Sequence, residues 1–134
     1  MTIALCIDDK NGMMFNKRRQ SRDRLLIKDL IASLDGRKLL VNSFSAPLFS
    51  EYPDSIEIME NPLDHAGGND VCFVENIDPS SYADKADRII LYRWNRHYPS
   101  DMKLTLDLGA YRLLSSRDFA GSSHEKITRE DYTK

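Results

Sequence analysis

The side-chain types of a serine–histidine–acid triad occur together near the end of the chain. His124 follows Ser122 and Ser123 and precedes Glu125. A triad requires a nucleophile, a base and an acid that meet in space, and adjacency in a polar segment does not align them. We therefore expect no nucleophilic catalysis from this segment.

Acidic side chains suggest two other kinds of chemistry. Asp8 and Asp9 could bind a divalent cation with Glu75, but an acidic turn is the ordinary interpretation, and we predict no metal site. Asp23 could act as a catalytic proton donor if it is buried. The alternative is that Asp23 only favours the start of a helix.

Basic residues suggest an anion site. Arg18 and Arg19 lie in the densest basic run, KRRQSR at 17–22. The run precedes a predicted helix, and helix N-termini favour anions, so a phosphate or carboxylate could bind there. His97, flanked by an arginine and a tyrosine, could also bind an anion. A solvated surface is the alternative in both places.

The composition is that of one globular domain spanning residues 1–134. Apolar residues make up 41% of the chain and charged residues 30%. No apolar run approaches the length needed to cross a bilayer, and no leader segment is recognisable. We expect a cytoplasmic protein without membrane contact, in which Cys6 and Cys72 are reduced thiols inside strands.

Charge is unevenly distributed around a net value of −2. Residues 50–87 hold one basic residue against ten acidic ones, whereas residues 1–38 hold nine against five. An acidic middle is unsuited to coating nucleic acid, and we expect no such partner. The asymmetry leaves open a homo-oligomer or a small anionic ligand.

Short apolar runs bounded by turn residues predict an α/β fold. The sheet is expected to be mixed, mainly parallel, with flanking helices and an antiparallel edge. Ser21 is the expected N-cap of the main helix, and residues 120–134 form a polar tail that is either an edge element or partly disordered. Strands are expected at 3–7, 38–41, 55–59, 71–74, 88–94, 102–108 and 111–115.

Polar residues directly follow three of these strands. Asp8 begins the loop after the first strand, Asn42 and Ser43 follow the second, and Glu75 and Asn76 follow the fourth. Ligands of α/β sheets bind where parallel strands end. We therefore predict a ligand site from these five residues with Arg18, Arg19 and His97.

Three stretches resemble dihydrofolate reductase. TIALCIDDKNGMMFNK at 2–17 resembles the family's first strand and the loop that folds over cofactor and substrate, and RKLLVNSFSAPLF at 37–49 resembles its next strand and helix. Residues 70–104 are similar to the region that begins at the cofactor-binding strand. The resemblance implies the family's fold and places Asp23 near its single active-site acid.

The same resemblance argues against the family's cofactor. Glu75 and Asn76 stand where the family has paired glycines, and Asn42 or Ser43 stands where it has a basic residue for the cofactor phosphate. We expect no cofactor, with NADPH required only if reductase activity survives.

Short chains of this kind also resemble sequences labelled ribonuclease Z. That activity needs a His-x-His-x-Asp-His metal motif, and the histidines here, His65, His97 and His124, are isolated. The residues do not support the label.

The favoured hypothesis is therefore a non-catalytic module on a reductase-like scaffold that binds a small molecule, an anion or a partner. One alternative is an NADPH-dependent reductase of a pterin-like substrate. The other is an oligomeric structural or interaction protein.

Overall fold

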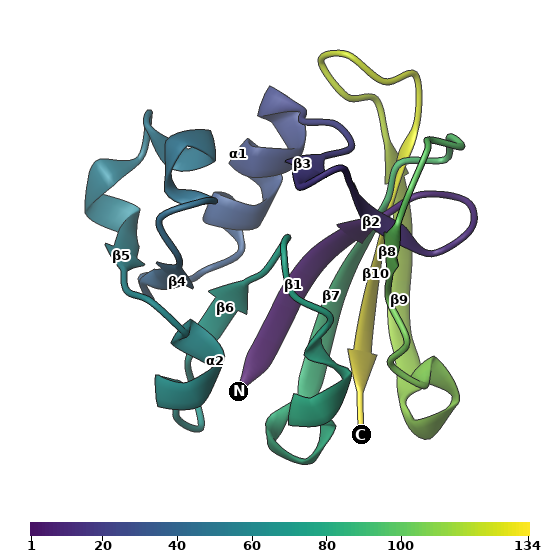
Figure 1. The fold of residues 1–134 in the computed structure, drawn as a ribbon. Coiled ribbons are helices and arrows are strands. Elements are labelled where there is room, and N and C mark those ends of the chain that lie inside the picture. Colours follow the sequence, from purple (N-terminus) through teal and green to yellow (C-terminus); the bar gives the residue numbers. More distant parts are fainter.

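The computed structural model describes residues 1–134 as a seven-stranded sheet with a small second sheet above one end (Figure 1). The large sheet has the order β5-β4-β6-β1-β7-β10-β9, and the small one has the order β3-β2-β8. The strands are β1 (Thr2–Ile7), β2 (Gly12–Phe15), β3 (Arg18–Arg19), β4 (Leu39–Val41), β5 (Ile56–Ile58), β6 (Val71–Phe73), β7 (Arg88–Arg93), β8 (Met102–Lys103), β9 (Arg112–Phe119) and β10 (Ile127–Thr133).

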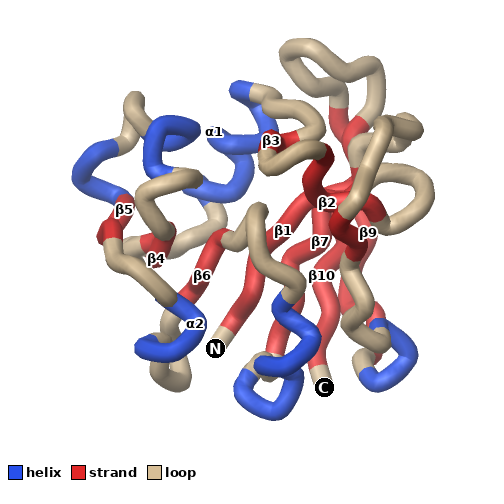
Figure 2. The backbone as a smooth tube through the Cα atoms, viewed as in Figure 1, coloured by secondary structure: helices blue, strands red, loops and turns tan.

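Helices are few and short, and most of them lie around β5, β4 and β6 (Figure 2). The main helix, α1 (Arg24–Ala32), packs on one face of the sheet, and α2 (Pro62–His65) is a single turn. The remaining four are 3₁₀ helices at Ala46–Phe49, Pro53–Ser55, Pro79–Lys85 and Leu108–Ala110. No helix has the length and apolar character that a bilayer crossing requires.

The predicted mixed sheet is confirmed. β1 pairs in parallel with both β6 and β7, and β4 pairs in parallel with β5 and β6. The antiparallel part comes from β10, which pairs with β7 on one side and β9 on the other. The parallel strands all end at the same edge, which also carries the start of α1, β3 and the loop before β10 (Figure 1).

Strand β7 shows why both faces of the sheet are buried. Ile89 and Leu91 join the core cluster on one face, while Ile90 and Tyr92 join the cluster beneath α1 on the other. Alternating side chains point to opposite faces of a strand, so a continuously apolar strand needs a core on each side. Cys6 and Cys72 are free thiols within β1 and β6.

Two segments differ from the expected elements. The segment 120–134 is not an edge element: it contains β10, which lies inside the sheet between β7 and β9. Residues 102–108 were expected to form a long strand, but only β8 pairs, with β2. Asp107 then caps a 3₁₀ turn by accepting from the Gly109 amide, which ends the extended backbone.

The N-cap of α1 is Asp23 rather than the expected Ser21. The Asp23 backbone is extended, and its carboxylate accepts from the amides of Leu25 and Leu26. An ionised acceptor close to two free amides is a stronger cap than a hydroxyl two residues earlier in the chain. Leu26 and Leu30, which lie four residues apart on one side of the helix, then face the core.

Candidate functional site

Three groups of residues meet at the edge where the parallel strands end: a polar cluster, a buried carboxylate with its histidine, and an open cavity. The polar cluster is built on Glu75. Its carboxylate accepts from Arg19 Nε at 2.9 Å and Nη2 at 3.0 Å, and from Ser45 Oγ at 2.6 Å. Arg19 also donates to the Phe44 carbonyl and lies over the Phe44 ring. The charges of Arg19 and Glu75 therefore neutralise each other, and their side chains take their hydrogen-bond partners from within the cluster.

The predicted strand-end residues are brought together only in part. Arg19 meets Glu75, and Asn42 Nδ2 donates to Asn76 Oδ1 at 2.9 Å. These four residues come from β3 and from the loops after β4 and β6, so the convergence follows from the parallel sheet. Three others, Arg18, Ser43 and His97, are exposed, and their side chains make no hydrogen bond or ion pair within the chain.

Asp8 stabilises a turn and is not available to a ligand. It is 1% exposed, and its carboxylate accepts from the amides of Lys10, Gly12 and Tyr98 and from the side chain of Gln20. Burial acts to raise the pKa of Asp8, but these hydrogen bonds outweigh it and lower the pKa below its ordinary value. The carboxylate holds the turn after β1 closed.

Asp23 lies at the centre of the second group. Besides capping α1, its carboxylate accepts from the backbone amides of Ser122 and Ser123, both at 2.9 Å, and from their hydroxyls. His124 Nδ1 lies 2.9 Å from Asp23 Oδ2. Burial acts to raise the pKa of Asp23, but the hydrogen bonds from Ser123, His124, Ser122 and Leu26 dominate and hold it well below its usual range.

An ionised Asp23 decides how the imidazole of His124 is arranged. A carboxylate can only accept, so Nδ1 must carry the proton that it donates to Asp23. Nε2 lies 3.0 Å from Ser21 Oγ and 3.1 Å from the Tyr98 hydroxyl. The ring is stacked on Trp94, with 4.6 Å between the centroids, and is almost completely buried.

The structure thus aligns a serine, a histidine and an aspartate that the sequence pattern did not connect. Ser122 and Ser123, the serines nearest to His124 in the chain, hold Asp23 instead. The hydroxyl at the imidazole belongs to Ser21, 103 residues away. The one feature of the sequence that could have indicated this arrangement is the pair Ser21 and Asp23, which lie two residues apart just before a helix.

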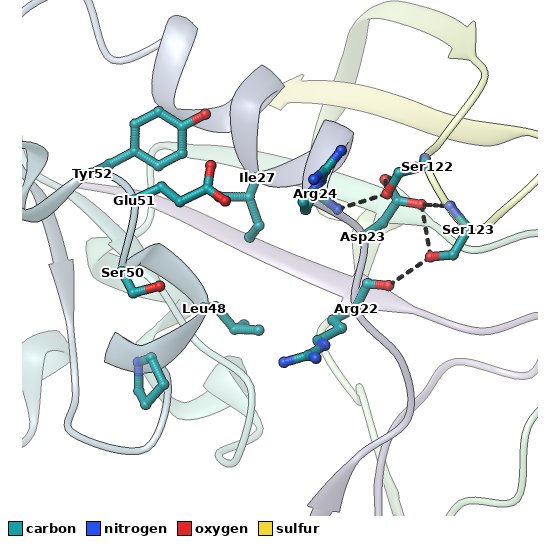
Figure 3. Close-up of a pocket in the computed structure, with 11 residues that line it drawn as sticks. Arg22, Asp23, Arg24, Ile27, Leu48, Ser50, Glu51, Tyr52, Ser122 and Ser123 are labelled. Atoms are coloured by element: carbon teal, nitrogen blue, oxygen red, sulfur yellow. Dashed lines mark hydrogen bonds between the residues drawn. The ribbon is translucent and has the colours of Figure 1, made fainter.

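An open cavity of about 300 Å³ lies between the start of α1 and residues 47–52 (Figure 3). Its apolar wall is formed by Ile27, Leu48 and the Tyr52 ring, with Glu51 on the same side. Arg22 and Arg24 line the opposite side, and neither guanidinium has an ion pair or hydrogen bond within the chain. In Figure 3 the Arg22 side chain extends towards Leu48. Ser50, Ser122 and Ser123 complete the polar lining.

A smaller recess, of about 20 Å³, adjoins this cavity on the sheet side of Asp23. Arg22, Asp23, Ile27 and Leu48 line both spaces. The recess is also lined by Ser21, Cys6, Glu75 and Trp94. Burial raises the pKa of the Cys6 thiol well above its ordinary value, so this side chain is a neutral thiol at physiological pH.

Comparison with known proteins identifies the fold. No family model matches the sequence, and no curated protein matches it. Among solved structures, the chain is similar to dihydrofolate reductase from Enterococcus faecalis, determined as a complex with NADP(H) and RAB-propyl. The TM-score is 0.69 with 8% identity, over 98% of this chain and 94% of that one. The fold is therefore dihydrofolate reductase-like, as the resemblance implied.

Proposed function

We propose that this protein binds a small anionic molecule in the cavity beside α1 and does not use a pyridine nucleotide. The proposal rests on the pair Arg22 and Arg24, which line an open cavity and whose guanidinium groups have no partner within the chain. Arginine side chains without partners are suited to carboxylate or phosphate recognition. The volume of about 300 Å³ is within the range of small-molecule sites.

The other side chains that line the cavity favour a particular class of anionic ligand. Ile27, Leu48 and the Tyr52 ring offer an apolar surface opposite the arginines, which suits a ligand with a flat or compact apolar part beside its anionic group. Glu51 lies on the same wall without a partner in the chain, so the two arginines face one unpaired acidic side chain. An aromatic carboxylate has both properties.

The polar cluster at the strand ends supports the part of the proposal that concerns the cofactor. In reductases of this fold, paired glycines allow the backbone to approach the dinucleotide, whereas here that position holds Glu75 and Asn76. The Glu75 side chain is only 10% exposed and is held by Arg19 and Ser45. These residues do not fit a dinucleotide, because side chains occupy the space that glycines leave free.

Calorimetric titration with benzoate and inorganic phosphate tests the binding site. We expect benzoate to bind and the double variant Arg22→Ala/Arg24→Ala to bind it at least about tenfold more weakly, the equivalent of one charge-assisted hydrogen bond. Arg112→Ala is the matched control, since Arg112 is exposed on β9 and far from the cavity in the sheet. Failure of both anions to bind at 10 mM contradicts the proposal.

A fluorescence titration with NADPH tests the cofactor. We expect no saturable change in NADPH emission on addition of protein. Saturable NADPH binding, accompanied by oxidation of NADPH when dihydrofolate is added, would establish a reductase instead.

A further inference from the structure

We propose that Ser21, His124 and Asp23 form a catalytic triad that hydrolyses esters of small acyl groups, an activity beyond anion binding. The sequence alone gave no reason to expect it, because the three residues come from opposite ends of the chain. The geometry is that of an activated nucleophile: Ser21 Oγ lies 3.0 Å from His124 Nε2, and Nδ1 lies 2.9 Å from Asp23 Oδ2. Both distances are within hydrogen-bond reach, as the mechanism requires.

The protonation pattern suits a general base. Asp23 accepts bonds from four backbone amides and two hydroxyls in addition to the imidazole, so it is an ionised acceptor. It therefore holds a proton on Nδ1, and in the neutral ring Nε2 is then the acceptor. The side chains of Asp23 and His124 are 0% and 2% exposed, and Trp94 fixes the ring plane. Asp23 acts here as a positioning residue.

Two hydroxyls compete for the one lone pair on Nε2. Ser21 Oγ has no other hydrogen-bond partner in the structure, and neither has the Tyr98 hydroxyl at 3.1 Å. Only one of them can donate fully to a neutral imidazole. We assign Ser21 as the nucleophile of the pair because Ser21 lines the recess, whereas Tyr98 does not.

Groups that can stabilise a tetrahedral oxyanion lie next to Ser21 in the chain. The backbone amides of Arg22 and Asp23 donate no hydrogen bond in the structure, and both residues lie outside helices and strands. Unpaired amides beside a nucleophile are the usual donors of an oxyanion hole. Arg22, whose guanidinium has no partner in the chain, lines the recess together with Ser21.

Water is the only reactant that the hydrolysis needs besides the ester. Ser21 Oγ attacks the acyl carbon and gives its proton to His124 Nε2; the bond from the acyl carbon to the leaving oxygen then breaks, and that oxygen takes the proton. Water next attacks the acyl-serine and passes a proton through Nε2 back to Ser21, which releases the carboxylic acid. The recess of about 20 Å³ has room for little more than a water molecule, so the acyl group must extend into the adjoining cavity of about 300 Å³.

Labelling of the full chain with a fluorophosphonate probe tests the triad, because the probe's phosphorus bonds to the serine oxygen with loss of fluoride. We expect one adduct per protein, mapped to Ser21 by peptide mass spectrometry, and hydrolysis of 4-nitrophenyl acetate that falls at least tenfold in Ser21→Ala. Ser116→Ala, an exposed serine on β9, is the matched control and keeps both signals. No adduct, or an adduct only on another residue such as His124, overturns the proposal.

Two further variants keep the test independent of folding and of the proposed ligand. Ser21→Cys retains a nucleophile, and we expect its thiol to react with iodoacetamide faster than Cys6 and Cys72, whose pKa values are raised by burial. Tyr98→Phe should retain labelling at Ser21, whereas loss of labelling in Tyr98→Phe with retention in Ser21→Ala would assign the activated hydroxyl to the tyrosine. None of these outcomes depends on whether benzoate binds to Arg22 and Arg24, so the two proposals fail separately.

Discussion

A single buried carboxylate, Asp23, organises the candidate site. It caps α1 and receives the loop before β10 through Ser122, Ser123 and His124. The sequence allowed two interpretations of Asp23, a buried proton donor or a helix-capping charge. The structure shows the cap and the burial together, which leaves no oxygen of the carboxylate without donors. Residue type predicted a favourable charge at the start of the helix, but not that Asp23 is its N-cap, nor the partners, because these lie about 100 residues away.

The pKa of Asp23 leads to a prediction for acid stability. Because its pKa is lower in the folded than in the unfolded chain, where an aspartate titrates near 3.9, Asp23 stabilises the fold above that pH and loses its contribution as the pH falls further. Asp23→Asn should reduce the free energy of unfolding at pH 7 by about 2 kcal/mol, since its amide group faces donors, and should flatten the acid limb below pH 5. Urea unfolding between pH 7 and pH 2 measures both, and Asp54→Asn, at an exposed site, should match the wild type.

Among the elements, strand 88–94 was predicted best and β10 worst. β7 is a continuous apolar run whose two faces could be assigned from alternation alone. β10 reads as polar because its sequence is ITREDYT, yet Arg129 is only 8% exposed. Its charge is satisfied by Asp29 and Asp131, at 2.9 and 3.0 Å. Pairing that depends on distant residues cannot be read from local hydropathy, so the segment was expected at an edge or in a tail.

The loop before β10 closes on the helix cap at Gly121, and this contact is open to test. A Cβ atom there would lie 2.3 Å from Asp23 Oδ2, and hydrogen bonds prevent the carboxylate from moving away. Gly121→Ala should therefore destabilise the fold by about 1–3 kcal/mol, the usual cost of overpacking. Gly68→Ala is the matched control, since no atom lies within 4 Å of its Cβ position. Equal melting temperatures for the two variants would contradict the close contact.

At the scale of the whole molecule, the sheet order explains which part of the site was predictable. Asn42 and Asn76 follow β4 and β6, which are adjacent parallel strands, so their meeting follows from the fold class. Ser21 and His124 meet because the chain end returns to the edge from which α1 starts. That return depends on the insertion of β10 between β7 and β9, which no local pattern indicated. The cavity beside α1 likewise depends on where the 3₁₀ turn at Ala46–Phe49 packs.

The inserted strand also predicts where the molecule is most sensitive to loss of apolar volume. Ile127 in β10 is 0% exposed and packs in the core beneath α1, whereas Ile58 in β5 is 57% exposed at the opposite edge of the sheet. Ile127→Ala should lower the free energy of unfolding by about 2–5 kcal/mol, and Ile58→Ala by less than about 0.5 kcal/mol. Chemical denaturation of the two variants measures the difference. Because Ile127 follows the loop that holds Asp23, its replacement should also loosen His124, which tryptophan fluorescence of Trp94 would report as a change in emission before global unfolding. A small effect at Ile127, similar to that at Ile58, would mean that β10 is not an inner strand.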